Sequence, residues 1–373
     1  MKDRILHLLS PQSSENNFLI TKFRNENVGI NFIRFILAFF VLLSHSWPLS
    51  GLGNDPTFVY KNLELTLGTF AVTLFFAISG YLVGFSAITR NPSDFIQSRI
   101  LRIFPAYIFC LFVSAFILGT IIHLSSGESL KSYFNFNQNG PFAYFLHNLV
   151  LPMDITYNIN NIFGSNPYNF AINGSLWTLP LEFRLYLLLL LLILIGKSIK
   201  LHFALMFFIG YLFLYFIADN MEIEILKVIY SSFIMDNINL ISVFFLSAAI
   251  AVYGNRFRIN SYIVVIALPF IFWFNFYIEI IGIVLMMTLL PKLSEILKLS
   301  RIGFFKNDIS YGLYIFAFPT QQAVIYFLPN LKLIEFIFLS LLFSSILSLF
   351  SWKFIESPIL KIKENRLSKL SEV

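Results

Sequence analysis

Ten stretches of 15 to 24 mostly apolar residues recur along the 373-residue chain, and they constrain its fold more than any other feature. A helix needs about 20 such residues to cross the hydrocarbon core of a bilayer. We therefore predict an all-α fold, a polytopic membrane helical bundle of about ten transmembrane helices. The predicted spans are 30–48, 66–87, 101–124, 176–196, 201–218, 238–253, 261–275, 276–290, 309–328 and 333–354. The shorter apolar segment 142–152 is predicted to be interfacial or re-entrant.

The composition excludes the other common protein classes. Charged residues make up 12% of the chain, against about 25% in an ordinary soluble domain. A globule so poor in charge has too few polar groups to cover its surface, which argues against a soluble cytosolic enzyme. The 46 phenylalanines and 17 tyrosines argue against a disordered chain. The single cysteine, Cys110, has no partner for a disulfide.

The basic residues indicate the orientation of the bundle. With the N-terminus in the cytoplasm, 21 of the 26 lysines and arginines fall in cytoplasmic segments and only four in outer segments. Cytoplasmic loops of membrane proteins carry an excess of lysine and arginine, so both termini are predicted to be cytoplasmic. This topology accounts for the net charge of +6, and we predict no nucleic-acid partner.

The chain divides into two tails and one membrane domain. Residues 1–28 are polar and are expected to form a cytoplasmic N-terminal tail without a cleavable signal peptide. The membrane domain is predicted over 29–356 and a basic cytoplasmic C-terminal tail over 357–373. The only long loop, 125–175, is predicted to lie outside. Its polar and aromatic residues suit a sugar-binding surface, and an ordered lid without a ligand role is the alternative.

Two ionisable residues share the first predicted span. Arg34 and His45 are 11 residues apart, so they project from nearly the same helix face, roughly 16 Å apart along the axis. An ionisable side chain within a span is expensive and is by default a candidate functional group. The alternative for His45 is a hydrogen-bonded interfacial histidine, with Trp47 as a neighbouring belt residue.

Two arginines stand at the predicted cytoplasmic entry of the third span. Arg99 and Arg102 are three residues apart, so both guanidinium groups lie on one helix face. Paired guanidinium groups are suited to bidentate binding of phosphate. A topology anchor that extends to the lipid headgroups is the alternative.

A carboxylate opens the fourth predicted span. Glu182 lies about 10 Å below the outer surface, at a depth similar to that of His45. The two side chains are therefore expected to pair, with Glu182 orienting the imidazole and raising its basicity. Arg184 is excluded as the partner because residues two apart do not face each other on a helix. Trp177 and Tyr186 flank this carboxylate as site-shaping residues or as packing aromatics.

Small and hydroxyl-bearing residues interrupt two other spans. Ser79-Gly80 and Ser310-Tyr311-Gly312 have the composition of helix-packing positions. Glu356, before Pro358, is expected to end the last span as a cytoplasmic cap or anchor. No spacing of cysteine and histidine typical of a metal site is present, so no metal is predicted.

These motifs, taken in order, resemble the membrane acyltransferase-3 family of bacterial integral-membrane acyltransferases. The resemblance runs from about Ile30 to Pro358 and depends on six motifs in the family's order. They are Arg34-x10-His45, Phe75-Phe-x-x-Ser79-Gly80-Tyr81-Leu82, Arg99-x-x-Arg102 with Pro105, Leu176-Trp177-Thr-Leu-x-x-Glu182-x-x-x-Tyr186, Ser310-Tyr311-Gly312-Leu-Tyr314 and Glu356-Ser-Pro358. Many members carry a histidine shortly after the fifth motif, where this chain has Gln321-Gln322. No role of that histidine is therefore carried over.

The resemblance implies an enzyme of the bacterial plasma (inner) membrane. Such proteins take an acyl group, usually acetyl, from cytoplasmic acyl-CoA and transfer it to carbohydrate hydroxyls of O-antigen, capsule or exopolysaccharide. The matched histidine is regarded as catalytic, and the matched arginines as donor-binding or structurally required.

Together, motif and geometry give one mechanistic hypothesis. His45 acts as general base or transient acyl carrier, and Glu182 holds its tautomer. Arg34, Arg99 and Arg102 bind the CoA phosphates, and Ser79, Tyr311, Trp177 and Tyr186 shape the substrate site. Two alternatives remain: a transporter or flippase using Arg34, His45 and Glu182 as a relay, and a transferase acting on a lipid-linked acceptor.

Overall fold

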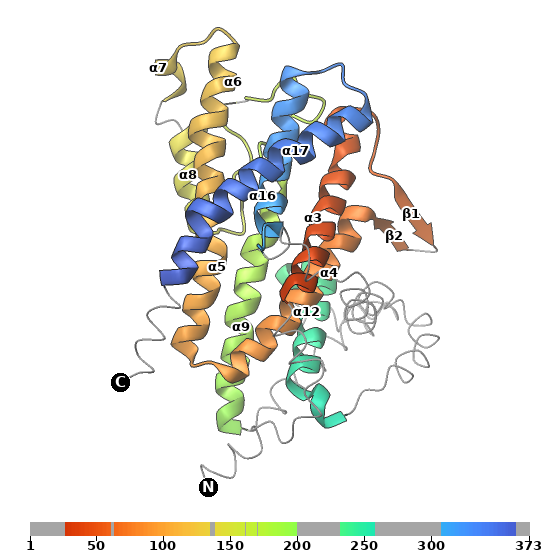
Figure 1. The fold of residues 1–373 in the computed structure, drawn as a ribbon, viewed down its shortest axis with the longest axis vertical. Helices are drawn as coiled ribbons and strands as arrows, with labels where there is room; N and C mark the ends of the chain where they lie inside the picture. The colour runs from red at the N-terminus through yellow and green to blue at the C-terminus, as the bar shows by residue number, and fades with distance from the viewer. Residues whose placement is uncertain are drawn as a thin grey trace.

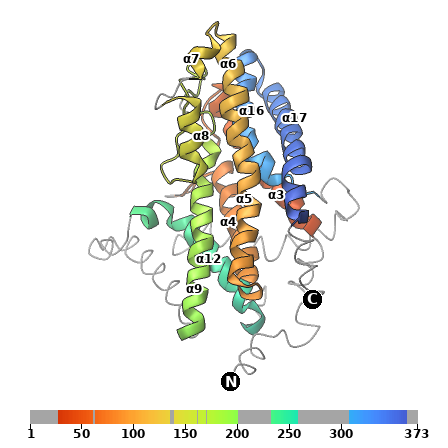
Figure 2. The same ribbon diagram turned by 90° about the vertical axis from the view of Figure 1, so that its left-hand side faces the viewer.

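The computed structural model describes residues 27–60, 63–134, 139–160, 162–169, 171–199, 232–257 and 307–362. These residues form a bundle of helices running roughly along the long axis of the molecule (Figures 1 and 2). The predicted spans 201–218, 261–275 and 276–290 lie outside the described residues, as do residues 1–26 and 363–373 of the two tails.

The bundle is built from long helices joined by shorter elements. The elements are α3 (Asn27–Ser50), β1 (Thr57–Tyr60), β2 (Leu63–Thr66), α4 (Leu67–Thr89), α5 (Pro92–Phe112), the π-helix η1 (Val113–Leu118), α6 (Gly119–Ser125), α7 (Leu130–Tyr133), α8 (Pro141–Leu149), the 3-10 helix η2 (Gly174–Trp177), α9 (Thr178–Ile199), α12 (Ser232–Phe257), α16 (Ser310–Phe327), α17 (Leu333–Ser351) and the π-helix η6 (Trp352–Glu356). The predicted helical fold is thus confirmed for the described part of the chain.

Five of the described helical segments are long and apolar enough to cross a membrane. They are Ile30–Ser50, Leu67–Thr89, Pro92–Ser125, Gly174–Ile195 and Leu333–Ile362. Each coincides with a predicted span, because a run of about 20 apolar residues is a strong signal. Helices α12 and α16 also coincide with predicted spans. The count of ten and the cytoplasmic placement of both termini stay predictions.

The third span begins earlier than predicted. Helix α5 starts at Pro92, nine residues before the apolar run, and continues through η1 and α6 to Ser125. Proline fits the first turn of a helix and Asp94 stands where the helix dipole favours an anion. Arg99 and Arg102 therefore lie within a helix rather than at its entry. The added turns carry both arginines into the bundle.

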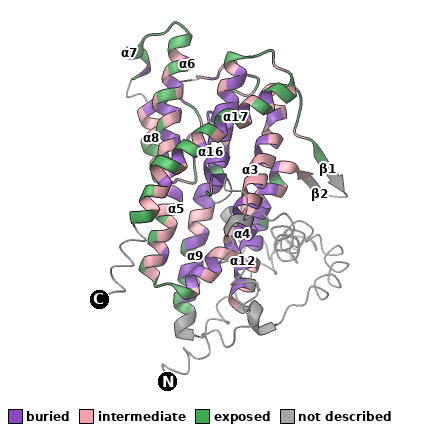
Figure 3. Cartoon of the chain, viewed as in Figure 1, coloured by how far each residue is buried: buried purple, intermediate pink, exposed green. Residues whose placement is uncertain are grey.

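Small residues bring the central helices into close contact, as their composition predicts. A Cβ at Gly84 would lie 2.9 Å from the Cα of Ala248, and one at Gly80 would overlap the carbonyl of Phe244, so α4 packs directly on the backbone of α12. Likewise, a Cβ at Gly312 would lie 3.0 Å from the Cα of Ser348 on α17. Figure 3 shows that buried faces turn inward, with α16 buried along most of its length.

Amide side chains hold the described parts of the predicted outer loop in place. Asn148 donates to the carbonyl of Thr156 at 2.8 Å and accepts from its N–H at 3.0 Å. Gln322 on α16 donates to the carbonyls of Tyr168 and Ala171 at 2.7 and 2.6 Å, and Asn166 donates to the Gln322 side chain at 2.7 Å. Buried amides with several partners fix a loop in one conformation.

A short antiparallel hairpin, β1 with β2, precedes α4 and was not predicted from the sequence. Ser44 of α3 holds both ends of this hairpin segment. Its hydroxyl donates to Asp55, before β1, and accepts from the N–H of Gly68, after β2, at 2.9 Å. This second bond sets the level of α3 against α4. The residue after Ser44 is the predicted catalytic histidine, so its height in the bundle is fixed as well.

Candidate active site

A cavity of about 920 Å³ extends into the bundle between α3, α4, α5, α9 and α16. On α4 its lining runs from Val72 to Arg90, a length of roughly 27 Å at 1.5 Å per residue. Thr89 and Arg90 at one end are exposed, whereas Thr178 at the other end is buried. The cavity is therefore a long, deep site with its open end at the last turn of α4.

Seven of the nine residues predicted from the sequence line this cavity. They are Arg34, Ser79, Arg99, Arg102, Glu182, Tyr186 and Tyr311. The other two, His45 and Trp177, do not line it. Because the seven come from five helices, only the tertiary packing of those helices brings them together.

Asp308 organises the arginines, and the sequence analysis missed it. Its carboxylate accepts from Arg34 at 2.7 Å and also pairs with Arg102. The three side chains are 12 to 21% exposed, and the Ser310 hydroxyl donates to the other carboxylate oxygen at 2.5 Å. Burial raises the pKa of Asp308, but the guanidinium groups of Arg102 and Arg34 outweigh burial and lower this pKa to about 2.

Asp308 could have been predicted from the sequence. Two arginines predicted inside a bundle need a counter-charge, since an unpaired buried charge is costly. Asp308 precedes the Ser310-Tyr311-Gly312 motif by two residues. A search for a carboxylate beside each motif would have found it.

Arg99 is arranged differently from the other two arginines. Its guanidinium lies 5.8 Å from the ring centroids of both Phe95 and Tyr186, and its Nε donates to Ser98 at 3.4 Å. Within the described part of the chain no carboxylate pairs with it. Aromatic faces hold the guanidinium in place without neutralising its charge. Arg99 is therefore a positioned cation that faces the cavity.

Glu182 does not pair with His45, so this prediction was wrong. Its carboxylate accepts from Ser79 of α4 at 2.7 Å and from Tyr186, and the two hydroxyls are 2.7 Å apart. Tyr186 lies one turn along α9, the spacing at which helical side chains meet. The two hydroxyls thus satisfy Glu182 without an imidazole. Arg184, as expected, points elsewhere and donates to the carbonyls of Leu151 and Pro180 at 3.1 Å.

His45 lies just beyond the closed end of the cavity. The Ser44–Gly68 hydrogen bond places it level with Gly68, which is four residues, or about 6 Å, before Val72 on α4. Its ring meets the edge of Phe318 with centroids 5.3 Å apart. Its Nδ1 is buried and accepts or donates no hydrogen bond to any described residue. His45 is thus partly buried in the bundle, and its Nδ1 has no hydrogen-bond partner among the described residues.

The remaining predicted residues have clear positions. Tyr311 donates to the carbonyl of Ile103 at 3.0 Å and lies under the Arg102 guanidinium, 5.8 Å from its ring centroid. Trp177 is 42% exposed and lies on the surface of the bundle. Glu356 does not end the last span, contrary to our expectation, because the helical segment continues to Ile362. It is 2% exposed and accepts from Ser351 at 3.0 Å.

Gln321 and Gln322 tie α16 to its neighbours. Gln321 donates to the carbonyl of Leu42 and to the Ser46 hydroxyl, both at 2.9 Å. Both acceptors lie within one turn of His45 on α3. Gln321 therefore holds the histidine-bearing turn against α16, while Gln322 holds the outer loop.

Comparison with known proteins identifies the family. Residues 27–353 match the acyltransferase-3 family, described as an acyltransferase domain. The chain belongs to this acyltransferase family. An O-acetyl transferase of Shigella phage Sf6 is 29% identical over 351 residues, which is 90% of this chain and 96% of the phage protein. Nodulation protein 10 of Rhizobium leguminosarum bv. viciae is 28% identical over 184 residues, 46% of each chain. No solved structure matches.

Membership establishes that the chain is an acyltransferase enzyme of a non-aminoacyl type. This favours catalysis over the transporter alternative for the intramembrane arginines, histidine and glutamate. In the described residues no group of three histidine, cysteine, aspartate or glutamate side chains is placed to hold a metal ion. The acyltransferase therefore presents two features for its chemistry, a cationic cavity and a partly buried histidine beyond its closed end.

Proposed function

We propose that this acyltransferase moves an acyl group, acetyl in the first instance, from cytoplasmic acyl-CoA to a hydroxyl of a cell-surface or exported polysaccharide. One observation carries the proposal. A cavity lined by Arg34, Arg99 and Arg102 ends about one helical turn from His45, a partly buried histidine whose Nδ1 has no hydrogen-bond partner among the described residues. Such an arrangement separates a donor site for an anionic cofactor from the reacting base.

The cationic cavity suits an acyl-CoA. The donor is polyanionic at its nucleotide end and slender at its thioester end. Arg99 and Arg90 lie free of carboxylate partners among the described residues, toward the open end of the cavity, where phosphates would dock. Arg34 and Arg102 share Asp308, so this cluster keeps one net positive charge further in. The slender arm of the donor then follows α4 toward Val72.

His45 is proposed as the base for the acceptor hydroxyl. In the proposed step the hydroxyl oxygen attacks the thioester carbonyl, the carbon–sulfur bond breaks, and the hydroxyl proton passes through His45 to the CoA thiolate. A transient acyl group on the imidazole is the other route. Glu182 acts from within the cavity, where it holds the Ser79 and Tyr186 hydroxyls beside the donor path.

Two observations support transfer of acetyl to a hydroxyl on the outer side, where a polysaccharide is the proposed acceptor. The relative of Shigella phage Sf6 is named an O-acetyl transferase. The ordered loop between α6 and η2 brings Tyr168 against Phe318, ring centroids 5.8 Å apart, and so covers the His45 side of the bundle. With the cavity mouth toward the cytoplasm, this loop faces the other side of a bacterial inner membrane, and both termini lie inside. A lipid-linked glycan reaches the same face.

The test is the O-acyl ester content of the surface glycan. Cells lacking the chain are compared with cells expressing wild type at a known membrane level. We expect alkali-labile acyl ester on the polysaccharide only with wild type. Ester found on a lipid-linked intermediate but not on finished polymer would identify the lipid-linked acceptor. Equal ester content in both cell types would contradict the proposed function.

Replacing Arg99 with alanine is expected to weaken donor binding. A charge-assisted hydrogen bond contributes about 1.5–3 kcal/mol, so the KM for acetyl-CoA should rise about 10- to 150-fold, with kcat less affected. Steady-state kinetics in detergent micelles measure both constants. The matched control is Lys332→Gln, which removes one exposed positive charge at the opposite end of the bundle. An unchanged KM in Arg99→Ala would exclude Arg99 from the donor site.

A further inference from the structure

We propose that Tyr314 forms the end wall of the donor cavity and thereby limits the acyl group to a short chain. This inference rests on the proposed function, since it assumes an acyl-CoA in the cavity. It goes beyond that function by assigning the residue that selects the acyl chain.

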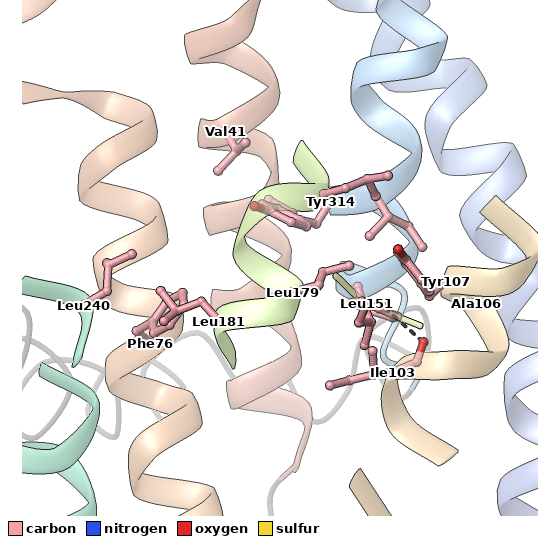
Figure 4. Close-up of a cluster of buried hydrophobic side chains, with 14 of the residues drawn as sticks. Val41, Phe76, Ile103, Ala106, Tyr107, Leu151, Leu179, Leu181, Leu240 and Tyr314 are labelled. Carbon is pink, nitrogen blue, oxygen red and sulfur yellow. Dashed lines mark hydrogen bonds between the residues drawn. The ribbon is translucent and has the colours of Figure 1, made fainter. Parts of the chain in front are cut away.

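The wall is built from three helices. Tyr314 of α16 lines the cavity and its hydroxyl is 2.8 Å from the hydroxyl of Thr178, the first residue of α9. Phe75 of α4 meets the Tyr314 ring edge-on, with centroids 5.7 Å apart. Figure 4 shows the Tyr314 side chain extending from α16 across the start of α9. A ring held by one hydrogen bond and one aromatic contact has a defined position.

A second layer lies one helical turn behind this wall. Phe318 follows Tyr314 by four residues on α16 and meets His45. A Cβ at Gly174 would lie 2.6 Å from the Phe318 ring, so the backbone before α9 packs directly on it. Neither Phe318 nor His45 lines the cavity. Tyr314 therefore stands between the cavity and the layer that contains the histidine.

The acyl group is the part of the donor that meets the wall. The phosphates stay with the arginines near the open end, so the thioester and its acyl chain lead into the closed end. An acetyl group adds only one methyl carbon beyond the carbonyl. Each further methylene has to displace the Tyr314 ring, which breaks its bond to Thr178 and disturbs a packed aromatic contact. One extra methylene in a fitted apolar pocket changes discrimination by about 10- to 200-fold.

The experiment compares acetyl-CoA with butyryl-CoA on the purified full chain. Wild type should prefer acetyl by a large ratio of kcat/KM. Tyr314→Ala should lower this ratio at least tenfold, because it opens space ahead of the thioester. Tyr314→Phe keeps the ring and should leave the ratio within about threefold of wild type. Tyr326→Phe is the fold control: it removes a tyrosine hydroxyl from the far end of α16, where Ser125 and Ser126 bind it.

A second measurement keeps the test independent of turnover. The affinities of butyryl-CoA and acetyl-CoA are compared by displacement of radiolabelled CoA from the same variants. In Tyr314→Ala the preference for acetyl-CoA over butyryl-CoA in binding should also fall at least tenfold. Thr178→Ala, which thins the wall from the α9 side, should shift both ratios in the same direction. Acyl transfer with an unchanged ratio in both alanine variants would overturn the inference and leave the proposed function intact. Absence of CoA binding and of transfer in wild type would overturn both.

Discussion

Replacing His45 with alanine is expected to lower acyl transfer by about 10²- to 10⁴-fold, the usual contribution of a positioned general base. The KM for acetyl-CoA should stay near its wild-type value, because His45 does not line the donor cavity. This split between kcat and KM distinguishes the base from the arginines, whose loss acts on KM. Initial rates with a soluble oligosaccharide acceptor, at several donor concentrations, measure it.

The matched control for His45 is His123→Ala on α6. His123 is hydrogen bonded to Ser132 at 2.9 Å on an exposed part of the bundle. Its replacement therefore measures the effect on activity of losing a histidine that lies away from the cavity. A folded His45→Ala protein with full transferase activity would contradict the mechanism. Release of one equivalent of CoA from wild type in the absence of acceptor would favour the acyl-histidine route over general base catalysis.

The spans could be predicted because a helix that crosses lipid requires a continuous run of about 20 apolar residues, which is visible in the sequence. Each described membrane-length helix coincides with an apolar run, and Arg34 and His45 share a helix as predicted. The helix boundaries were harder to predict. Arg99 and Arg102 lie inside α5 because the polar segment that begins at Pro92 is helical. A hydropathy pattern detects apolar runs and does not detect a polar helical turn.

The pairing of Glu182 with His45 failed because their depths in the bundle differ. The Ser44–Gly68 bond places His45 level with Gly68, whereas Ser79, which binds Glu182, lies 11 residues, or about 16 Å, further along α4. The depth expected for Glu182 was counted from the start of its apolar run, as if that start lay at the surface. In the structure Leu176 and Thr178 are already buried. Hydropathy gives the length of a span and does not give the level at which the span starts.

The separation of His45 from the donor cavity also has a consequence for catalysis. Tyr314 and Phe318 lie one turn apart on α16, and both stand between the thioester and the imidazole. In the proposed mechanism, attack on the thioester therefore requires these rings to move once both substrates are bound. The acyl chain is selected earlier, when the donor binds against the closed wall. Until the rings move, the wall separates the bound donor from the His45 side and so limits its hydrolysis.

Asp308→Ala is expected to be the most damaging substitution for the folded protein. It leaves the Arg34 and Arg102 guanidinium groups, each about 20% exposed, without their shared counter-charge. Removing one partner of a buried ion pair costs about 3–5 kcal/mol. We expect a marked fall in the temperature at which the purified protein loses its monodisperse state, and a loss of donor binding. Asp308→Asn keeps the shape and the bond to Ser310, so it separates charge from packing.

The pH dependence provides an independent test of the same cluster. The pKa of Asp308 is about 2 in the folded protein, below the value of about 3.9 for an exposed aspartate. A depressed pKa means that the carboxylate stabilises the fold fully above pH 4 and progressively less as the pH falls toward 2. Wild type should therefore lose thermal stability over that interval and approach Asp308→Asn, which lacks this titration. If Asp308→Asn were as stable as wild type at pH 7, Asp308 would not be the residue that holds Arg34 and Arg102. Another group would then have to fix these two side chains in the donor cavity.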